Sequence, residues 1–240
     1  MILNVIWLVL SVVLGGLFVT LLNQHQSSII KLTLAFGGGF LLSIAFIHFV
    51  PELYEQGGPE IGFYILGGFL IQLILEFFSG GIEHGHIHVQ KQNAIPYALL
   101  FSLSVHSFIE GIPLGTDSLF SQAHGSHTHG DNTLLLGIVF HQFPVAIALM
   151  TLLINSKLSA KKSWFLLLIF GLMTPAGLWF GNIQESMGNT FDFSIMMAIV
   201  VGMFLHISTT IIFETSENHK FNLLKLTAII VGVVMAIFIH

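Results

Sequence analysis

Apolar runs of about twenty residues alternate with short polar stretches along the whole chain. An α-helix needs roughly 20 such residues to cross the hydrocarbon core of a bilayer. Eight runs fit that length, so we predict an all-α, polytopic membrane protein with one domain over residues 1–240. The predicted spans are residues 2–22, 32–50, 61–78, 94–115, 133–154, 164–181, 193–213 and 223–239.

Composition supports an integral membrane protein and limits its chemistry. Hydrophobic residues make up 54% of the chain and charged residues only 8%, whereas soluble domains are about 25% charged. The chain has no cysteine, so any transition-metal site must use imidazole and oxygen donors. It has 13 histidines but only 7 basic residues, all lysine. We expect the lipid bilayer and small cations as partners, and no nucleic acid.

The lysines predict the orientation. Every one lies at or beside the loops that follow the first, third, fifth and seventh spans. Short cytoplasmic loops accumulate basic residues, so these loops are predicted to be cytoplasmic and both termini to be outside the cell membrane. The remaining loops are acidic and would concentrate cations at the outer face. The lysines are Lys31, Lys91, Lys157, Lys161, Lys162, Lys220 and Lys225.

Two polar residues interrupt the span at 94–115. His106 and Glu110 are four residues apart, so on a helix both side chains lie on one face. A charged carboxylate at the bilayer centre costs at least about 2.5 to 3.5 kcal/mol, so Glu110 requires a compensating cation. A metal ion held by the two side chains would meet that requirement.

Other polar residues lie at the same predicted depth. His141 and Gln142 fall inside the span at 133–154, and His206 inside the span at 193–213. Any one of them alone could serve a structural hydrogen bond. As a set with His106 and Glu110 they suit Zn²⁺ and similar ions, which accept mixed imidazole and oxygen donors. Pro144 follows Gln142 by two residues and could bend the helix at the site.

Five motifs in these spans are similar to those of the ZIP family of divalent-metal transporters. The resemblance implies uptake of Zn²⁺ or a related ion into the cytoplasm, a metal site between the fourth and fifth helices, and a homodimer. Carried over by position, the transport ligands are His106, Glu110, His141 and Gln142, and Ser107 replaces an asparagine ligand of many members. The motifs are AFIHFVPE from Ala45, HSFIEG from His106, HQFPVAIAL from His141, MTPAGLWFG from Met173 and GMFLH from Gly202.

The chain also departs from the family pattern. Members with two adjacent metals carry a glutamate just after the proline of the fifth helix and another just before the proline of the sixth. Val145 and Thr174 occupy these positions here. Because Glu110 alone cannot offset two dications, we predict a single ion at this site.

A second pattern predicts the route of the ion. Residues 39–52 and 202–214 both open with glycine and close with glutamate, although their helices cross in opposite directions. This pattern favours an inverted repeat, with helices 1–3 and 6–8 related to each other around helices 4 and 5. The residues predicted along the route are His48, Glu52, Ser107, His206 and Glu214.

Two histidine clusters lie in polar, glycine-containing loops. Histidine-rich tracts bind metal, so one cluster would collect ions outside and the other would receive them inside. A spacer without function is the alternative for each. The inner cluster is His84, His86 and His88, and the outer cluster is His124, His127 and His129.

The mechanism predicted from these features is alternating access, in which the fourth and fifth helices shift as a unit relative to the others and carry the midplane site. The donor set would accept Zn²⁺, Cd²⁺, Fe²⁺, Mn²⁺ or Co²⁺. No nucleotide-binding P-loop is present, so transport would follow the ion gradient or use protons. The competing function is an intramembrane zinc hydrolase, in which His106, His141 and His206 bind zinc and Glu110 acts as general base. The chain lacks the HExxH signature of zinc proteases, so we predict a transporter and not an enzyme.

Overall fold

Helices account for all the regular secondary structure in the described part of the chain. The computed structural model describes residues 1–22, 27–79, 96–116, 129–187, 192–214 and 223–238. The helices are α1 (Ile2–Leu22), α2 (Ser27–Ile44), η1 (Ala45–Phe49), α3 (Val50–Gly57), α4 (Ile61–Ser79), α5 (Tyr97–Gly111), η3 (Ile112–Gly115), α7 (His129–Asn155), α8 (Ala160–Ser186), α9 (Phe193–Glu214) and α10 (Leu223–Phe238). The all-α prediction is confirmed for these residues.

Each predicted span corresponds to a helix or to a continuous series of helical segments. Seven are long and apolar enough to cross a membrane, and α10 is a shorter apolar helix. Large apolar side chains point outward on many of them, among them Phe63, Phe77 and Phe101, which are 76, 83 and 67% exposed. Water would penalise such surfaces, whereas lipid accepts them, so the outer surface suits a bilayer. The inverted repeat and the single domain stay predictions.

The second span is longer than the sequence pattern suggests. The predicted span ends at residue 50, but helical structure continues to Gly57. A π-helical segment, Ala45–Phe49, precedes the proline, and Pro51 occupies the first turn of α3. A first-turn proline loses no intrahelical donor, and π segments shift the hydrogen-bond register. The predicted end of this helix was therefore wrong.

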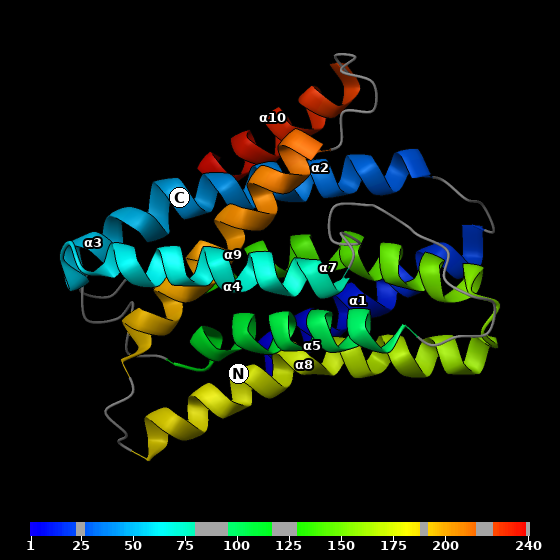
Figure 1. Ribbon diagram of the computed structural model, residues 1–240, viewed down its shortest axis with the longest axis horizontal. Coiled ribbons are helices and arrows are strands. Elements are labelled where there is room, and N and C mark those ends of the chain that lie inside the picture. Colours follow the sequence, from blue (N-terminus) through cyan, green and yellow to red (C-terminus); the bar gives the residue numbers. More distant parts are fainter. Residues whose placement is uncertain (23–26, 80–95, 117–128, 188–191, 215–222, 239–240) are drawn as a thin grey trace.

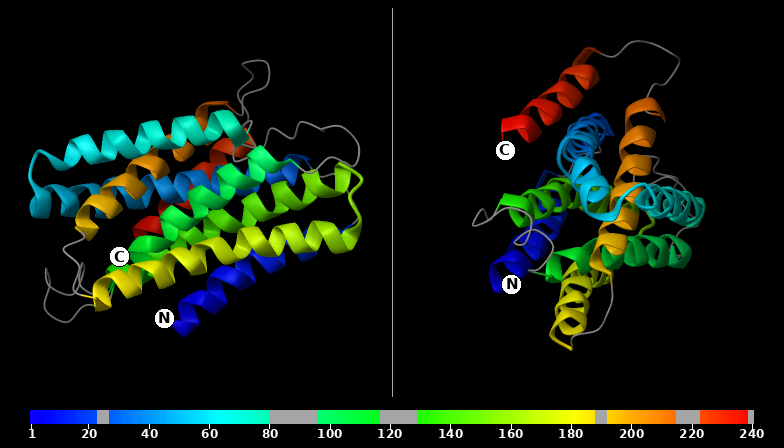
Figure 2. Two further views of the ribbon diagram at one scale, coloured as in Figure 1. Left: turned by 60° about the horizontal axis from the view of Figure 1, so that its bottom comes forward. Right: turned by 90° about the vertical axis from the view of Figure 1, so that its left-hand side faces the viewer.

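The helices fall into two groups of four. Extensive pairings join α1 with α7 and α5 with α8, and α1 also packs on α8. In the other group α2 pairs with α10 and α4 with α9, while α2 also packs on α9. The helices run roughly along one long axis, with α9 crossing obliquely (Figure 1) and α10 on the outer side of α2 (Figure 2). The groups meet mainly where α2 contacts α7 and where α4 contacts α5.

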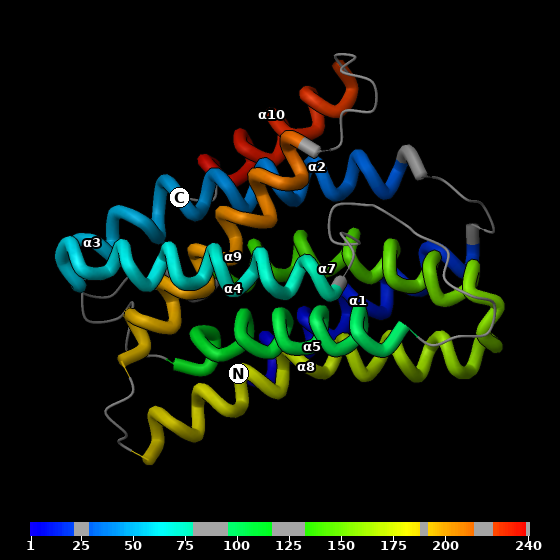
Figure 3. The backbone as a smooth tube through the Cα atoms, viewed as in Figure 1, coloured from blue at the N-terminus to red at the C-terminus, as the bar shows by residue number. Residues whose placement is uncertain are grey.

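Glycines hold the paired helices close together. A Cβ atom on Gly111 of α5 would lie 2.1 Å from the carbonyl oxygen of Thr174, and one on Gly177 of α8 would lie 2.0 Å from that of Phe108. The α4 and α9 pair is equally close, since a Cβ on Gly202 would lie 1.9 Å from the carbonyl oxygen of Ile65. Small residues allow this backbone approach in membrane helices. Within each group the helix pairs are therefore firmly packed, and the backbone trace in Figure 3 shows α5 beside α8.

Candidate metal-transport site

Three ionisable side chains converge in the interior of the protein. His106 and Glu110 of α5 and His141 of α7 each offer a ligand atom, and these atoms lie within 4.8 Å of one another. All three side chains are buried, with 2, 0 and 1% exposure. The sequence predicted that these residues share one site, and the structure brings them together. We name these three residues the donor cluster.

Helix geometry accounts for the shape of the donor cluster. The i, i+4 spacing on α5 puts His106 Nε2 2.7 Å from Glu110 Oε1. The His141 ring meets the His106 ring edge to face, with centroids 5.9 Å apart. Two lone pairs that face each other at 2.7 Å repel, so this contact is favourable only with a proton or a cation between the two atoms. A dication bound between them would meet this requirement and would displace any proton held there.

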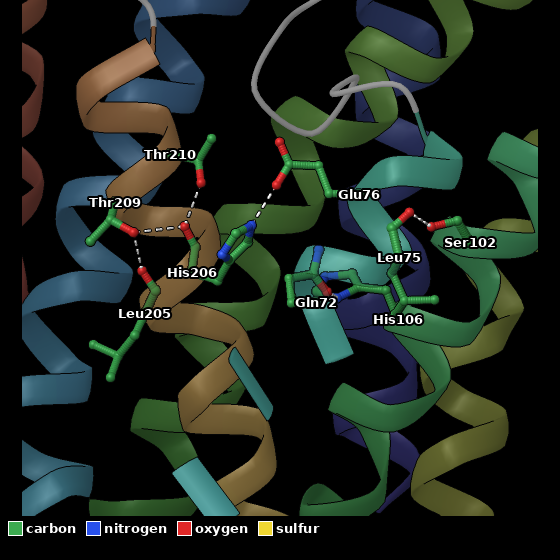
Figure 4. Close-up of polar contacts among 9 residues, drawn as sticks. All are labelled: Gln72, Leu75, Glu76, Ser102, His106, Leu205, His206, Thr209 and Thr210. Atoms are coloured by element: carbon green, nitrogen blue, oxygen red, sulfur yellow. Dashed lines mark hydrogen bonds and ion pairs between the residues drawn. The ribbon is translucent and has the colours of Figure 1, made fainter. Parts of the chain in front are cut away.

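A glutamine from another helix contacts the donor cluster. Gln72 of α4 is fully buried, and its Oε1 lies 2.9 Å from His106 Nδ1. One turn along α4, the carbonyl oxygen of Leu75 accepts a 2.5 Å hydrogen bond from the Ser102 hydroxyl of α5. Figure 4 shows both contacts between the two helices. Sequence reasoning missed Gln72, although a lone amide in an otherwise apolar span was a visible signal.

Gln142 lies next to His141 but is engaged with two other helices. Its side-chain nitrogen donates to the hydroxyl of Thr174 on α8, and its Oε1 lies 3.5 Å from the hydroxyl of Ser11 on α1. The residue is buried, at 1% exposure. To bind a metal, Gln142 Oε1 would therefore break only this long hydrogen bond. In the ZIP pattern described above, members with two adjacent metals have a glutamate at the position of Thr174. Here that position offers only a hydroxyl.

His206 is not part of the donor cluster. Its Nε2 contacts Glu76 Oε2 of α4 (Figure 4). Its ring packs edge to face on the ring of Phe69, with centroids 4.6 Å apart. The sequence placed His206 at the same depth as His106 and His141, but the structure directs it toward α4. Glu76 was missed by sequence reasoning, even though a carboxylate near the end of an apolar span is itself a functional signal.

The comparison with protein families agrees with this arrangement. The family model for ZIP zinc transporters matches residues 79–240, which include every residue of the donor cluster. The chain belongs to the ZIP zinc transporter family. The resemblance stated from the motifs is thereby confirmed, and α5, α7, α8, α9 and α10 lie within the ZIP match.

Individual ZIP relatives are distant. The chain is 27% identical to the protein zntD of Dictyostelium discoideum over 157 residues, which cover 59% of this chain and 22% of that protein. It is 27% identical to zinc transporter ZIP1 of Bos taurus, over 81% of this chain and 58% of the relative. It is also 27% identical to the metal cation symporter ZIP8 of Homo sapiens, over 48% of this chain and 23% of that protein. The chain thus spans less than two thirds of the length of each of these proteins.

The other predicted residues are not members of the donor cluster, and some of them lie outside the described residues. Ser107 is buried beside His106, and its hydroxyl has no hydrogen-bond partner among the described residues. His48 of η1 and Glu52 of α3 are both half-buried, and Glu52 accepts a 3.1 Å hydrogen bond from Gln56. Glu214 is the last residue of α9.

Five of the loop histidines, His84, His86, His88, His124 and His127, lie outside the described residues. His129 is the first residue of α7 rather than part of a loop. Pro144 lies inside α7, which remains one α-helix from His129 to Asn155.

Proposed function

We propose that this protein carries divalent metal ions, foremost Zn²⁺, across a membrane into the cytoplasm. The observation that supports this most strongly is the donor cluster, in which two imidazoles and one carboxylate meet with no more than 2% exposure. Such a set is costly to bury without a cation. Mixed nitrogen and oxygen donors are those that Zn²⁺ accepts. Zinc is also the substrate named for zinc transporter ZIP1, to which the chain is similar.

The ion would be held by His106, Glu110, His141 and Gln142. Gln142 would turn its oxygen from Ser11 toward the ion, while its nitrogen stays on Thr174. Glu110 supplies the one negative charge, which offsets half of one dication. A second ion beside the first would meet only the hydroxyl of Thr174 and the apolar Val145, so we propose a single ion. Proton release on binding makes uptake weaker in acid.

The route is proposed to follow the orientation predicted from the lysines. Ions would gather at the acidic outer loops, pass His48 and Glu52, and reach the donor cluster. On the cytoplasmic side they would pass the contact between Glu76 and His206, since α4 and α9 both end toward lysine-bearing loops. Glu214 and the loop histidines would receive the ion last.

Alternating access is proposed to involve the two helix groups. The α5 and α8 pair and the α1 and α7 pair are closely packed, so we propose that these four helices shift as a unit relative to α2, α4, α9 and α10. The unit predicted from the sequence contained only helices 4 and 5, and the glycine contacts extend it to α8. A shift of this kind would carry the donor cluster between the two faces.

Assembly, membrane and metal preference are part of the same proposal. We propose a homodimer in the cell membrane with both termini outside. Cd²⁺, Fe²⁺, Mn²⁺ and Co²⁺ are further candidate substrates because the donor set does not exclude them. ZIP8 is named a metal cation symporter, which supports testing both other metals and a coupled ion.

The alternative, a zinc hydrolase, finds less support. Its three-histidine site requires His206 beside His106 and His141, but His206 contacts Glu76 and is not a member of the donor cluster. No group of three candidate ligands that includes His206 occurs among the described residues.

The experiment that tests the proposal is uptake into proteoliposomes containing a zinc-sensitive dye. Zn²⁺ should enter protein-containing vesicles and not protein-free ones, with Cd²⁺ and the other ions as competitors. An imposed pH gradient should change the rate if protons are coupled. Absence of any metal flux from protein that is folded and binds zinc would overturn transport, whereas hydrolysis of a lipid or peptide would favour the alternative.

A further inference from the structure

The contact between Gln72 and His106 fixes the position of a proton. An amide oxygen can only accept, so the hydrogen on the 2.9 Å contact must belong to His106 Nδ1. The second nitrogen, Nε2, then faces Glu110 Oε1 at 2.7 Å. Gln72 thereby selects which imidazole nitrogen points into the donor cluster.

We propose that Gln72 is a positioning residue for the transported ion, acting through His106. Metal-binding histidines usually donate their second ring N–H to an acceptor, which fixes the tautomer and the ring orientation. Gln72 supplies that acceptor here. It does not touch the ion itself and is absent from the predicted ligand set. The inference rests on the proposed function, because it gives the donor cluster its metal.

The place of Gln72 in the fold adds a second role. His106 belongs to α5, which is tightly packed on α8 through glycines, whereas Gln72 belongs to α4, which is tightly packed on α9. The contact therefore joins one helix group to the other. If the groups shift, the acceptor leaves Nδ1 and the His106 ring loses its fixed orientation. Gln72 thus links the affinity for the ion to the conformation of the transporter.

A purely structural role for Gln72 predicts different behaviour. In that case Gln72 would only satisfy a buried polar group and hold α4 against α5. The hydrogen bond from Ser102 to the Leu75 carbonyl oxygen joins the same two helices one turn away, without contacting the donor cluster. Ser102→Ala is therefore a matched control, since it weakens the helix contact and leaves the imidazole untouched.

The test measures zinc binding to purified protein in detergent. Gln72→Leu removes the acceptor and should raise the dissociation constant of Zn²⁺ about 10- to 100-fold, the usual cost of losing such a partner. Gln72→Glu restores a stronger acceptor and should bind at least as tightly as the unmodified protein. Ser102→Ala should stay within about threefold of the unmodified protein, because metal affinity follows the ligands and their direct partners.

Nitrogen NMR of labelled histidine supplies a readout that helix packing would not change. The His106 signals, assigned by their loss in His106→Asn, should show the proton on Nδ1, and Gln72→Leu should abolish this preference. A His106 ring that carries no proton on Nδ1 in the unmodified protein would overturn the inference.

The binding results separate the two proposals. Unchanged affinity in Gln72→Leu, or equal weakening in Gln72→Glu, would also overturn the role of Gln72. If Gln72→Leu does not fold, the role of Gln72 is decided by the Zn²⁺ affinity of Gln72→Glu and by the tautomer of His106 in the unmodified protein. No zinc binding by the folded, unmodified protein would instead refute the proposed function.

Discussion

Two contacts between an imidazole and a carboxylate, both in the described part of the chain, differ in burial and in the number of donors around them. His106 and Glu110 lie on one helix, are 2 and 0% exposed, and are joined by His141. His206 and Glu76 join two helices, are 7 and 18% exposed, and belong to no group of three candidate ligands among the described residues. Three enclosed donors can replace most of an ion's water, whereas two partly exposed donors can replace only some of it.

The two contacts are related through one face of α4. Gln72 and Glu76 are a single turn apart, and each contacts a different histidine, His106 of α5 and His206 of α9 (Figure 4). An ion that leaves the donor cluster past α4 would meet Glu76 next. We therefore expect equilibrium binding at the donor cluster and only a kinetic effect at the second contact.

The largest effect is expected from Glu110→Gln. Removing the carboxylate leaves a dication with neutral donors in a buried site, where loss of a charged partner typically costs about 3 to 5 kcal/mol. Zinc uptake into proteoliposomes should fall at least about 100-fold, since 1.4 kcal/mol is a factor of ten. Circular dichroism should show the same helix content. Normal zinc and cadmium uptake by this variant would remove Glu110 from transport.

Val145→Glu should increase the difference in ion binding between the donor cluster and the Glu76–His206 contact, because it adds a second carboxylate near the donor cluster. Two unit charges 4 Å apart attract by about 4 kcal/mol at an effective dielectric near 20, before desolvation is subtracted. We expect about tenfold tighter zinc binding, a net gain near 1.4 kcal/mol. The maximal transport rate should fall because the ion must also leave.

Val145→Gln, of similar size and without charge, is the control for that substitution. It should not tighten zinc binding, so the gain can be assigned to the charge. A maximal rate in Val145→Glu above that of the unmodified protein would contradict the account.

Glu76→Gln should have a smaller and purely kinetic effect. We expect the maximal uptake rate to fall about threefold, in keeping with the modest energy of a partly exposed ion pair. The dissociation constant of Zn²⁺ in detergent should remain that of the unmodified protein. A loss of equilibrium binding as large as that of Glu110→Gln would show that the two contacts do not differ as proposed.

Thr174→Val should have the smallest effect. The substitution keeps the shape of the side chain but removes the hydroxyl that accepts from Gln142. One neutral hydrogen bond contributes about 1 kcal/mol, so zinc affinity should fall no more than about fivefold. Competition with a chromophoric chelator can resolve this change. Tighter zinc binding would mean that Thr174 holds Gln142 away from the ion.

The sequence predicted the position of residues along each helix better than the direction in which they face around it. Spans and the depth of His106, Glu110 and His141 follow from apolar length and helical spacing. The contact partner of His206 could not be predicted in this way, because helices that are apolar on nearly every side give no periodic signal for the face they bury. Gln72 and Glu76 were missed for that reason, since their significance depends on α4 packing between α5 and α9.

Local backbone changes were a second source of error. The end of the second span depends on a π-helical segment that lets the helix continue past Pro51. No motif in the sequence predicts such a π-helical segment. The loss of the second metal, in contrast, was predicted from Val145 and Thr174, and it remains a prediction about occupancy.

The most direct test of the central claim is anomalous diffraction from crystals soaked in saturating zinc. The account predicts one strong peak about 2.0 to 2.2 Å from nitrogen and oxygen ligands of His106, Glu110 and His141, with Gln142 or water completing the shell. Any density between Glu76 and His206 should be weak. Two equally occupied ions at the donor cluster, or a strong peak only between Glu76 and His206, would contradict it.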